Sequence, residues 1–146
     1  YSPLQTIFWY DKPSFYHGEP EMEWFENLQT VFDDTKVLDG APGKNITMAR
    51  RKGQEWFVAA MTNNEGSEEE IPLTFLDKEK NYLACIYTDG GEKIKTSTQV
   101  KCTYLLVNAS QTMKFQLKPS GGAAIRLVPI DRQEMKKYKK YKGERL

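Results

Sequence analysis

Residues 45–62 read NITMARRKGQEWFVAAMT, and this stretch decides the fold class. Its second half, residues 55–62, is the most apolar run of the chain, which favours a strand across the centre of a sheet. Lys52 and Gly53 separate it from residues 45–51 and are typical of a hairpin turn. The stretch therefore predicts two neighbouring antiparallel strands.

Turn signals continue on both sides of this hairpin at a spacing of roughly 8–14 residues, which is typical of antiparallel sandwiches and barrels. They fall at residues 39–43, 52–53, 63–66, 77–78, 89–91, 108–110 and 119–122. The segments between them are short and rich in β-branched and aromatic residues, as at 82–88, 113–117 and 123–128. We expect an all-β fold: an antiparallel β-sandwich of about seven or eight strands over residues 29–130, preceded by a short helical or irregular segment.

Length and composition exclude several classes of protein. The chain has 146 residues, enough for one domain with a core but too few for a (β/α)8 barrel, which needs about 250. The formal net charge of +1 gives no overall attraction to nucleic acid. No apolar run approaches the roughly 18 residues of a membrane span. We therefore expect neither a nucleic-acid partner nor a membrane span.

The first 28 residues do not follow the sandwich pattern. They carry five acidic residues against one lysine and many aromatics, and they begin with Tyr1 rather than Met, so we expect a processed chain or a part of a longer one. Residues 20–28 predict a helix with Pro20 in its first turn, and Met22, Phe25 and Leu28 share one of its faces. The aromatic residues lack an apparent partner in the chain, which indicates that a neighbouring domain covers them.

Residues 131–146 form a basic tail with seven basic and three acidic residues. Its lysines and tyrosines alternate with almost no aliphatic side chains. We expect a solvated or frayed terminus, with a short surface helix after Pro129. The alternative is a polybasic contact for nucleic acid or anionic lipid.

Catalytic and metal-binding patterns are absent from the sequence. His17 is the only histidine, which excludes histidine-based triads and multi-histidine metal sites within one chain. Cys85 and Cys102 bracket the turn at 89–91 on strands that we expect to be adjacent, so a cross-strand disulfide and two free thiols both stay open. The glycines lack the spacing of phosphate-binding loops. We expect no metal and no cofactor in this chain.

The acidic residues do not form the pair of carboxyl groups that a glycosidase places across its sugar site. Asp33 and Asp34 are adjacent, so in a strand they point to opposite faces. Residues 68–70 are three consecutive glutamates after a turn, which is typical of a solvated sheet edge. Neither group predicts an acid and base pair.

The three tryptophans are the candidates for stacking on a sugar, because their faces suit apolar sugar surfaces. Trp56 lies in the most apolar predicted strand, which favours a place in the core. Trp9 and Trp24 lie in the acidic head, where packing against the head itself or a neighbouring domain is favoured over sugar binding.

A series of segments, in order along the chain, resembles the C-terminal part of glycoside hydrolase family 97. The segments are PLQ (3–5), FWYD (8–11), GEPEMEWF (18–25), TVFDDTKVLDG (30–40), ARRKGQEWF (49–57), TN (62–63), IPLTFL (71–76), IYTD (86–89) and PSGGAAIRL (119–127). The resemblance covers all of the chain except the basic tail. Where the family usually has Pro-Thr-Val-Trp-Asp, this chain has Gln-Thr-Val-Phe-Asp at 29–33.

The resemblance implies a periplasmic or secreted bacterial α-glucosidase or α-galactosidase as the parent enzyme. Its catalytic carboxylates and its calcium would belong to a (β/α)8 barrel outside this chain, so no catalytic residue is carried over. Residues 1–28 would then be the end of the barrel region and the interdomain segment. Residues 29–130 would be the C-terminal β-sandwich, which supports the barrel without catalysing, and residues 131–146 would be the tail.

The sequence leaves two roles open for the head. In the first, Trp9, Tyr10, Trp24 and Phe25 contact the (β/α)8 catalytic domain of the same polypeptide. In the second, these aromatics bind an α-linked oligosaccharide, and the chain is a carbohydrate-binding module for α-glucans.

Overall fold

The computed structural model describes residues 1, 12–16, 18–91, 95–96 and 98–146. The strands are β1 (Asp34–Ala41), β2 (Asn45–Lys52), β3 (Glu55–Thr62), β4 (Ser67–Pro72), β5 (Asn81–Asp89), β6 (Val100–Asn108), β7 (Thr112–Leu117), β8 (Gly122–Ile130) and β9 (Lys139–Lys140). The helical pieces are η1 (Pro13–Phe15), α1 (Met22–Asn27) and η2 (Glu134–Lys137). None of the helices in the described part of the chain has the length and apolar content needed to cross a membrane.

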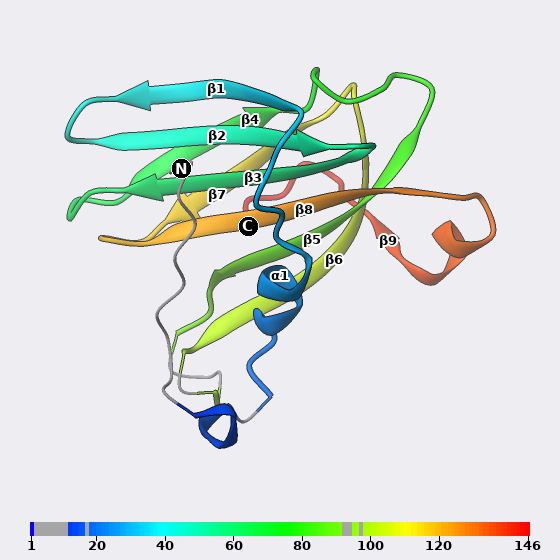
Figure 1. Ribbon diagram of the computed structural model, residues 1–146. Coiled ribbons are helices and arrows are strands. Elements are labelled where there is room, and N and C mark those ends of the chain that lie inside the picture. Colours follow the sequence, from blue (N-terminus) through cyan, green and yellow to red (C-terminus); the bar gives the residue numbers. More distant parts are fainter. Residues whose placement is uncertain (2–11, 17, 92–94, 97) are drawn as a thin grey trace.

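Two sheets of unequal size face each other (Figure 1). The larger, sheet A, has the strand order β1-β2-β3-β8-β5-β6-β9, and the smaller, sheet B, pairs β4 with β7. Among the described residues the strands pair antiparallel except for the short contact of β9 with β6, and an isolated parallel bridge also joins Lys114 to Arg145. The expected all-β sandwich is confirmed, with eight strands in the described part of residues 34–130.

The hairpin predicted at residues 45–62 is present. Asn45 pairs with Thr62 at one end and Lys52 with Glu55 at the other, so Gly53 and Gln54 form the two-residue turn. Gly53 has a φ of +57°, which glycine adopts without a steric cost. The turn is one residue later than the sequence suggests.

The core lies between the sheets, because alternate side chains of each strand point to the same face. On β3, Trp56 and Val58 point inward, and Phe57 points to the opposite, outer face of sheet A. The predicted core position of Trp56 is confirmed. From sheet B, Ile71 and Phe115 are almost completely buried against these residues.

Glu69 corrects the expectation that residues 68–70 form a solvated edge. Glu68 and Glu70 are exposed, but only 3% of Glu69 is accessible. Its carboxylate accepts hydrogen bonds from Asn45 Nδ2 (2.9 Å), Thr47 Oγ1 (3.3 Å) and Ser67 Oγ (2.6 Å). The alternation of β4 turns this side chain inward, where polar groups of β2 satisfy it. Glu69 thus connects sheet B to sheet A.

The basic tail is not a frayed terminus, which is a second correction. Its lysines are exposed, but Tyr141 is 3% accessible and belongs to the core. The Tyr141 hydroxyl donates to the Glu144 carbonyl (2.8 Å) and accepts from the Lys114 amide (3.0 Å). Leu146 exchanges backbone hydrogen bonds with β7, at Lys114 and Gln116. The expected short surface helix is present as η2.

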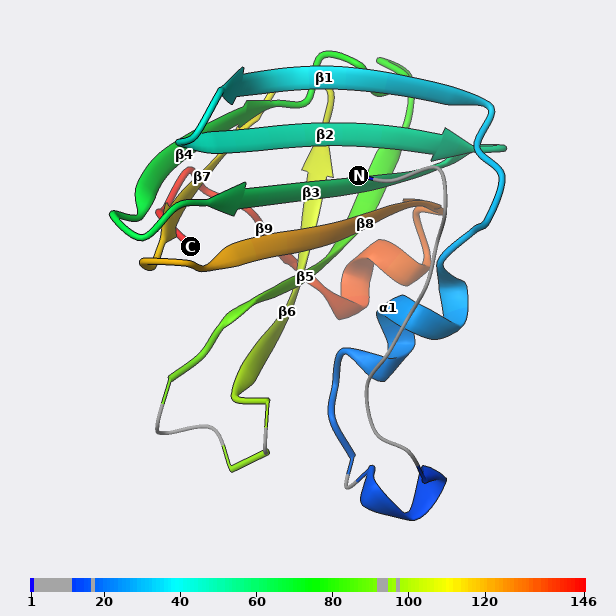
Figure 2. The same cartoon turned by 60° about the vertical axis from the view of Figure 1, so that its left-hand side comes forward.

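Helix α1 lies over the outer face of sheet A (Figure 2). Helix α1 spans Met22–Asn27 and is shorter than the predicted 20–28. None of its residues is fully buried, so Met22 and Phe25 do not form a fully covered face. The expectation that the head aromatics lack a partner in this chain is wrong for Trp24, which packs on sheet A.

Candidate functional site

An aromatic cluster covers the middle of the outer face of sheet A. Trp24 from α1 meets the ring of Phe57 on β3 edge to face, with centroids 5.5 Å apart, and that of Tyr87 on β5 at 6.1 Å. Phe32, which follows α1, also meets Phe57 edge to face, with ring centroids 5.8 Å apart, and the Arg50 guanidinium lies 4.4 Å from the centre of the Phe32 ring. Such edge-to-face pairs stabilise beyond the area they bury. The cluster therefore holds α1 on the sheet.

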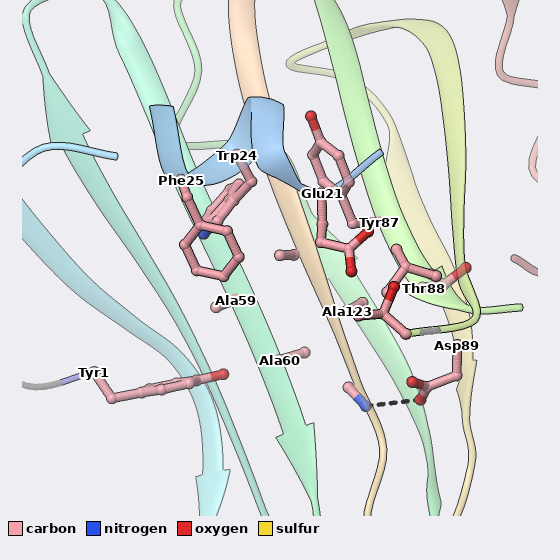
Figure 3. Close-up of a pocket in the computed structure, with 14 residues that line it drawn as sticks. Tyr1, Glu21, Trp24, Phe25, Ala59, Ala60, Tyr87, Thr88, Asp89 and Ala123 are labelled. Atoms are coloured by element: carbon pink, nitrogen blue, oxygen red, sulfur yellow. Dashed lines mark hydrogen bonds between the residues drawn. The ribbon is translucent and has the colours of Figure 1, made fainter. Parts of the chain in front are cut away.

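A pocket of about 520 Å³ opens beside this cluster, between α1 and the sheet. The residues that line it are Tyr1, Glu21, Trp24, Phe25, Ala59, Ala60, Tyr87, Thr88, Asp89, Thr98, Val100, Gly122, Ala123 and Ala124. Figure 3 shows Trp24 and Phe25 reaching from α1 toward β3, with Ala59 beneath them. Small side chains on neighbouring strands make the floor, which keeps the space open.

Two carboxylates line the pocket. Glu21 stands at the start of α1, and its side chain makes no capping hydrogen bond to the helix. It is 8% accessible, and its Oε2 has no hydrogen-bond partner among the described residues. Asp89, at the end of β5, is exposed and accepts a hydrogen bond from the Gly122 amide (3.2 Å; Figure 3). The pocket thus combines apolar walls with negative charge.

The structure brings together two of the four residues that the sequence singles out. Trp24 and Phe25 both line the pocket and are half-buried. Trp9 and Tyr10 lie outside the described residues, as does His17. Glu21 and Tyr87 also line the pocket, although the sequence does not single them out. The alternation of β5 could have placed Tyr87 on the outer face, but no local signal distinguishes Glu21 from the other helix glutamates.

The cysteines are free and occupy adjacent strands, β5 and β6. Cys85 stands opposite Tyr104 and Cys102 opposite Tyr87, so the two cysteines are not paired across the ladder. Burial raises the pKa of the Cys85 thiol to about 12, and the nearby Glu23 carboxylate adds to the shift. A thiol with this pKa is not a nucleophile at neutral pH.

The remaining candidate carboxylates have structural roles. Asp33 accepts hydrogen bonds from the Gly53 amide (2.7 Å) and Lys52 Nζ (3.2 Å), which together lower its pKa. Asp34 forms an exposed ion pair with Lys36 at 3.4 Å. Within the described residues no three His, Cys, Asp or Glu side chains gather in a way that could hold a metal ion.

Comparison with known proteins identifies the family. Residues 31–128, more than half of the chain, match the family described as "Glycosyl-hydrolase 97 C-terminal, oligomerisation". The chain belongs to this family. The resemblance found in the sequence is confirmed, and the family 97 domain is the β-sandwich, while the catalytic parts of its relatives lie elsewhere.

Two curated relatives of this family 97 domain are named as α-galactosidases. The "Retaining alpha-galactosidase" of Bacteroides thetaiotaomicron is 35% identical over 118 residues, which is 80% of this chain and 18% of that protein. The "Probable retaining alpha-galactosidase" of Streptomyces bingchenggensis is 26% identical over 113 residues, which is 77% of this chain and 16% of that protein. The chain therefore spans less than a fifth of the relatives' length.

Solved structures agree with this placement. A family 97 enzyme from Pseudoalteromonas sp. strain K8, in complex with acarbose, superposes with a TM-score of 0.70 and 30% identity, over 78% of this chain and 19% of that one. A β-arabinopyranosidase superposes with a TM-score of 0.56 at 24% identity, over 72% of this chain and 16% of that one, which shows a shared fold alone.

Proposed function

We propose that this domain docks against the catalytic barrel of a family 97 α-glycosidase and stabilises it without taking part in the chemistry. The observation that carries this proposal is the apolar pocket on the outer face of sheet A, next to Trp24 and Phe25. Sheet B covers the inner face of sheet A, and the pocket lies on the outer face, where a neighbouring domain can reach it. The oligomerisation named in the family description adds a second role, the joining of copies of the enzyme.

The docking role is tested with Phe25→Ala in two proteins, the 146-residue chain and the full-length enzyme. Phe25 lines the pocket but is only half-buried here, so its truncation has a modest effect on the chain. A covering domain would complete its burial, and we expect a clearly larger loss of unfolding free energy in the full-length enzyme, calculated from the melting temperature and the unfolding entropy of each protein. Val31→Ala, at an exposed position, is the control. Equal losses of unfolding free energy in both proteins would refute docking at this face.

The activity of the parent is proposed as retaining α-galactosidase, because two relatives carry that name. α-Glucosidase activity is the alternative, since another family 97 enzyme is recorded with acarbose. Hydrolysis of p-nitrophenyl α-galactoside and α-glucoside by the full-length enzyme distinguishes them. Proton NMR of the first sugar released separates retention from inversion.

We further propose a periplasmic or secreted location and a calcium ion in the parent's barrel, both supported by the family resemblance. Since no candidate metal cluster occurs among the described residues, the calcium ligands would come from the catalytic part. Cell fractionation tests the location. Metal analysis of the full-length enzyme and of this chain tests the calcium, which should stay with the former.

A carbohydrate-binding role is the second candidate function. One observation favours it: Trp24, Phe25 and two carboxylates line a single open pocket, and aromatic faces with hydrogen-bond acceptors suit a sugar. Titration of the chain with maltooligosaccharides, followed by tryptophan fluorescence, measures it directly. Saturable binding that Trp24→Ala abolishes would establish this role.

A further inference from the structure

The charged side chains described in the lining of the pocket on the outer face of sheet A are acidic. Glu21 and Asp89 line it, and none of the described residues in its lining is basic. Asp89 already accepts a hydrogen bond from the backbone of Gly122. Glu21 is therefore the carboxylate whose charge is least compensated.

Glu21 is an unusual residue to bury without a partner. It is 8% accessible, its Oε2 has no hydrogen bond among the described residues, and no ion pair involves it there. A buried carboxylate is costly unless it is paired, and a cation beside it offsets that cost. In Figure 3 its side chain points from α1 toward the end of β5, into the pocket.

Besides the carboxylate, the walls of the pocket suit the methylene groups and the planar end of a long basic side chain. Ala59 and Ala124 form an apolar floor along which methylene groups can lie. Trp24 and Phe25 stand above that floor, and an aromatic face attracts a guanidinium. Arginine suits the site better than lysine, because its planar group is weakly hydrated, stacks on aromatic rings and can form two hydrogen bonds to one carboxylate.

We propose that this pocket receives an arginine side chain from the catalytic part of the same polypeptide, which pairs with Glu21 and stacks on Trp24. The inference rests on the proposed docking function, because most of the length of the relatives lies outside the matched region. A sugar is disfavoured as the occupant. Its hydroxyl groups need several polar partners around the ring, whereas this lining is mainly apolar.

The first test compares Glu21→Gln in the 146-residue chain and in the full-length enzyme. In the chain alone the substitution removes a buried charge, so we expect the melting temperature to stay the same or to rise. In the full-length enzyme it removes the counter-charge of the arginine, and we expect a fall of about 3 °C or more. Glu26→Gln, at an exposed position of α1, is the matched control and should change neither protein.

An unchanged or raised melting temperature of the full-length Glu21→Gln enzyme overturns the proposal, and an equal fall in both proteins overturns it too. These outcomes are distinct from a failure of docking itself. If Phe25→Ala weakens the full-length enzyme more than the chain while Glu21→Gln does not, the domain docks at this face without the arginine.

The second test measures the recognition directly, with the chain and Nα-acetylarginine amide at millimolar concentrations. The indole resonance of Trp24 should shift with arginine and not with the citrulline analogue, which has the same shape without the charge. Glu21→Gln should abolish the shift. An equal response to citrulline, a response to maltotriose but not arginine, or no response to any of the three overturns the proposal.

Discussion

Glu69 shows how one buried charge can join two sheets. Its neighbours on β4, Glu68 and Glu70, are exposed and meet cations at the surface: Arg145 at 2.6 Å and Lys114 at 3.2 Å. Glu69 instead accepts hydrogen bonds from Asn45, Thr47 and Ser67. Charge-assisted hydrogen bonds of this kind are stronger than neutral ones, and a buried group left without its partner carries a desolvation cost.

We predict that Glu69→Ala lowers the free energy of unfolding by about 2–4 kcal/mol, because it strands the buried Thr47 hydroxyl and breaks the link between the sheets. Urea unfolding followed by circular dichroism measures the loss. Glu70→Ala on the same strand removes only an exposed ion pair and should cost less than about 1 kcal/mol. Similar losses for the two variants would contradict the linking role.

Asp33 predicts a pH effect. Hydrogen bonds from the Gly53 amide and Lys52 hold its pKa below the ordinary value of 3.8 in the folded state. A lowered folded-state pKa means that the ionised group adds stability above about pH 4, and that this contribution is lost as the pH falls through the folded pKa. Asp33→Asn should therefore flatten the acid side of the stability profile. Melting temperatures between about pH 5 and pH 2 measure this, and parallel profiles would exclude it.

At the scale of elements, the C-terminal segment covers the core where β6 of sheet A and β7 of sheet B lie, and it bonds to both strands. β9 lies along β6 of sheet A, and Leu146 bonds to β7 of sheet B. Tyr141 lies between them, within the core, and its hydroxyl bonds to the Lys114 amide and the Glu144 carbonyl. Sheet B has two strands in the part of the chain that the structure describes, so this segment covers core that a larger second sheet would cover.

We predict that Tyr141→Ala destabilises the chain by about 3–5 kcal/mol, because it removes a large buried ring. Tyr141→Phe keeps the ring and loses the two hydroxyl contacts, so its cost should be about 1–2 kcal/mol. Tyr138→Ala, three residues earlier and only half-buried, is the control. Chemical unfolding measures all three variants. If Tyr141→Ala loses no more stability than the control, the C-terminal segment does not stabilise the sandwich.

At the scale of the whole molecule, sheet A consists of two groups of strands that are each continuous in sequence, and β8 joins the two groups. β1, β2 and β3 form one local meander and β5 with β6 a local hairpin, while β8 pairs with both β3 and β5. Because one strand belongs to both halves, we predict a single cooperative unfolding transition. Tryptophan fluorescence, which includes the buried Trp56, and far-ultraviolet circular dichroism should give the same midpoint. Two separated midpoints would show that the halves unfold independently.

Local patterns were enough to predict the strands, the hairpin turn and the core position of Trp56, because each depends on neighbours in sequence. Burial of charged or tyrosine-rich segments was not predictable in this way. Residues of β2 donate hydrogen bonds to the Glu69 carboxylate, and the backbone amide of Lys114 on β7 donates one to the Tyr141 hydroxyl. The burial of both side chains therefore depends on contacts distant in sequence. Glu21, just before α1, is buried and Glu26 within α1 is exposed, and this depends on which side of α1 meets the sheet. Trp24 is a candidate from the sequence, but its partner Phe57 is not, because Phe57 and the core residue Trp56 are neighbours in one apolar run.

The place of β8 in sheet A also bears on how the chain folds. Its partner β3 lies some sixty residues earlier, as in the pairing of Ala60 with Ala123, so this closure is non-local and slow relative to the hairpins. Until β8 inserts, β3 and β5 each present an unpaired edge. At high protein concentration the β8 strand of another copy can pair with these two edges, so refolding should yield strand-exchanged dimers. Refolding at high dilution should avoid them.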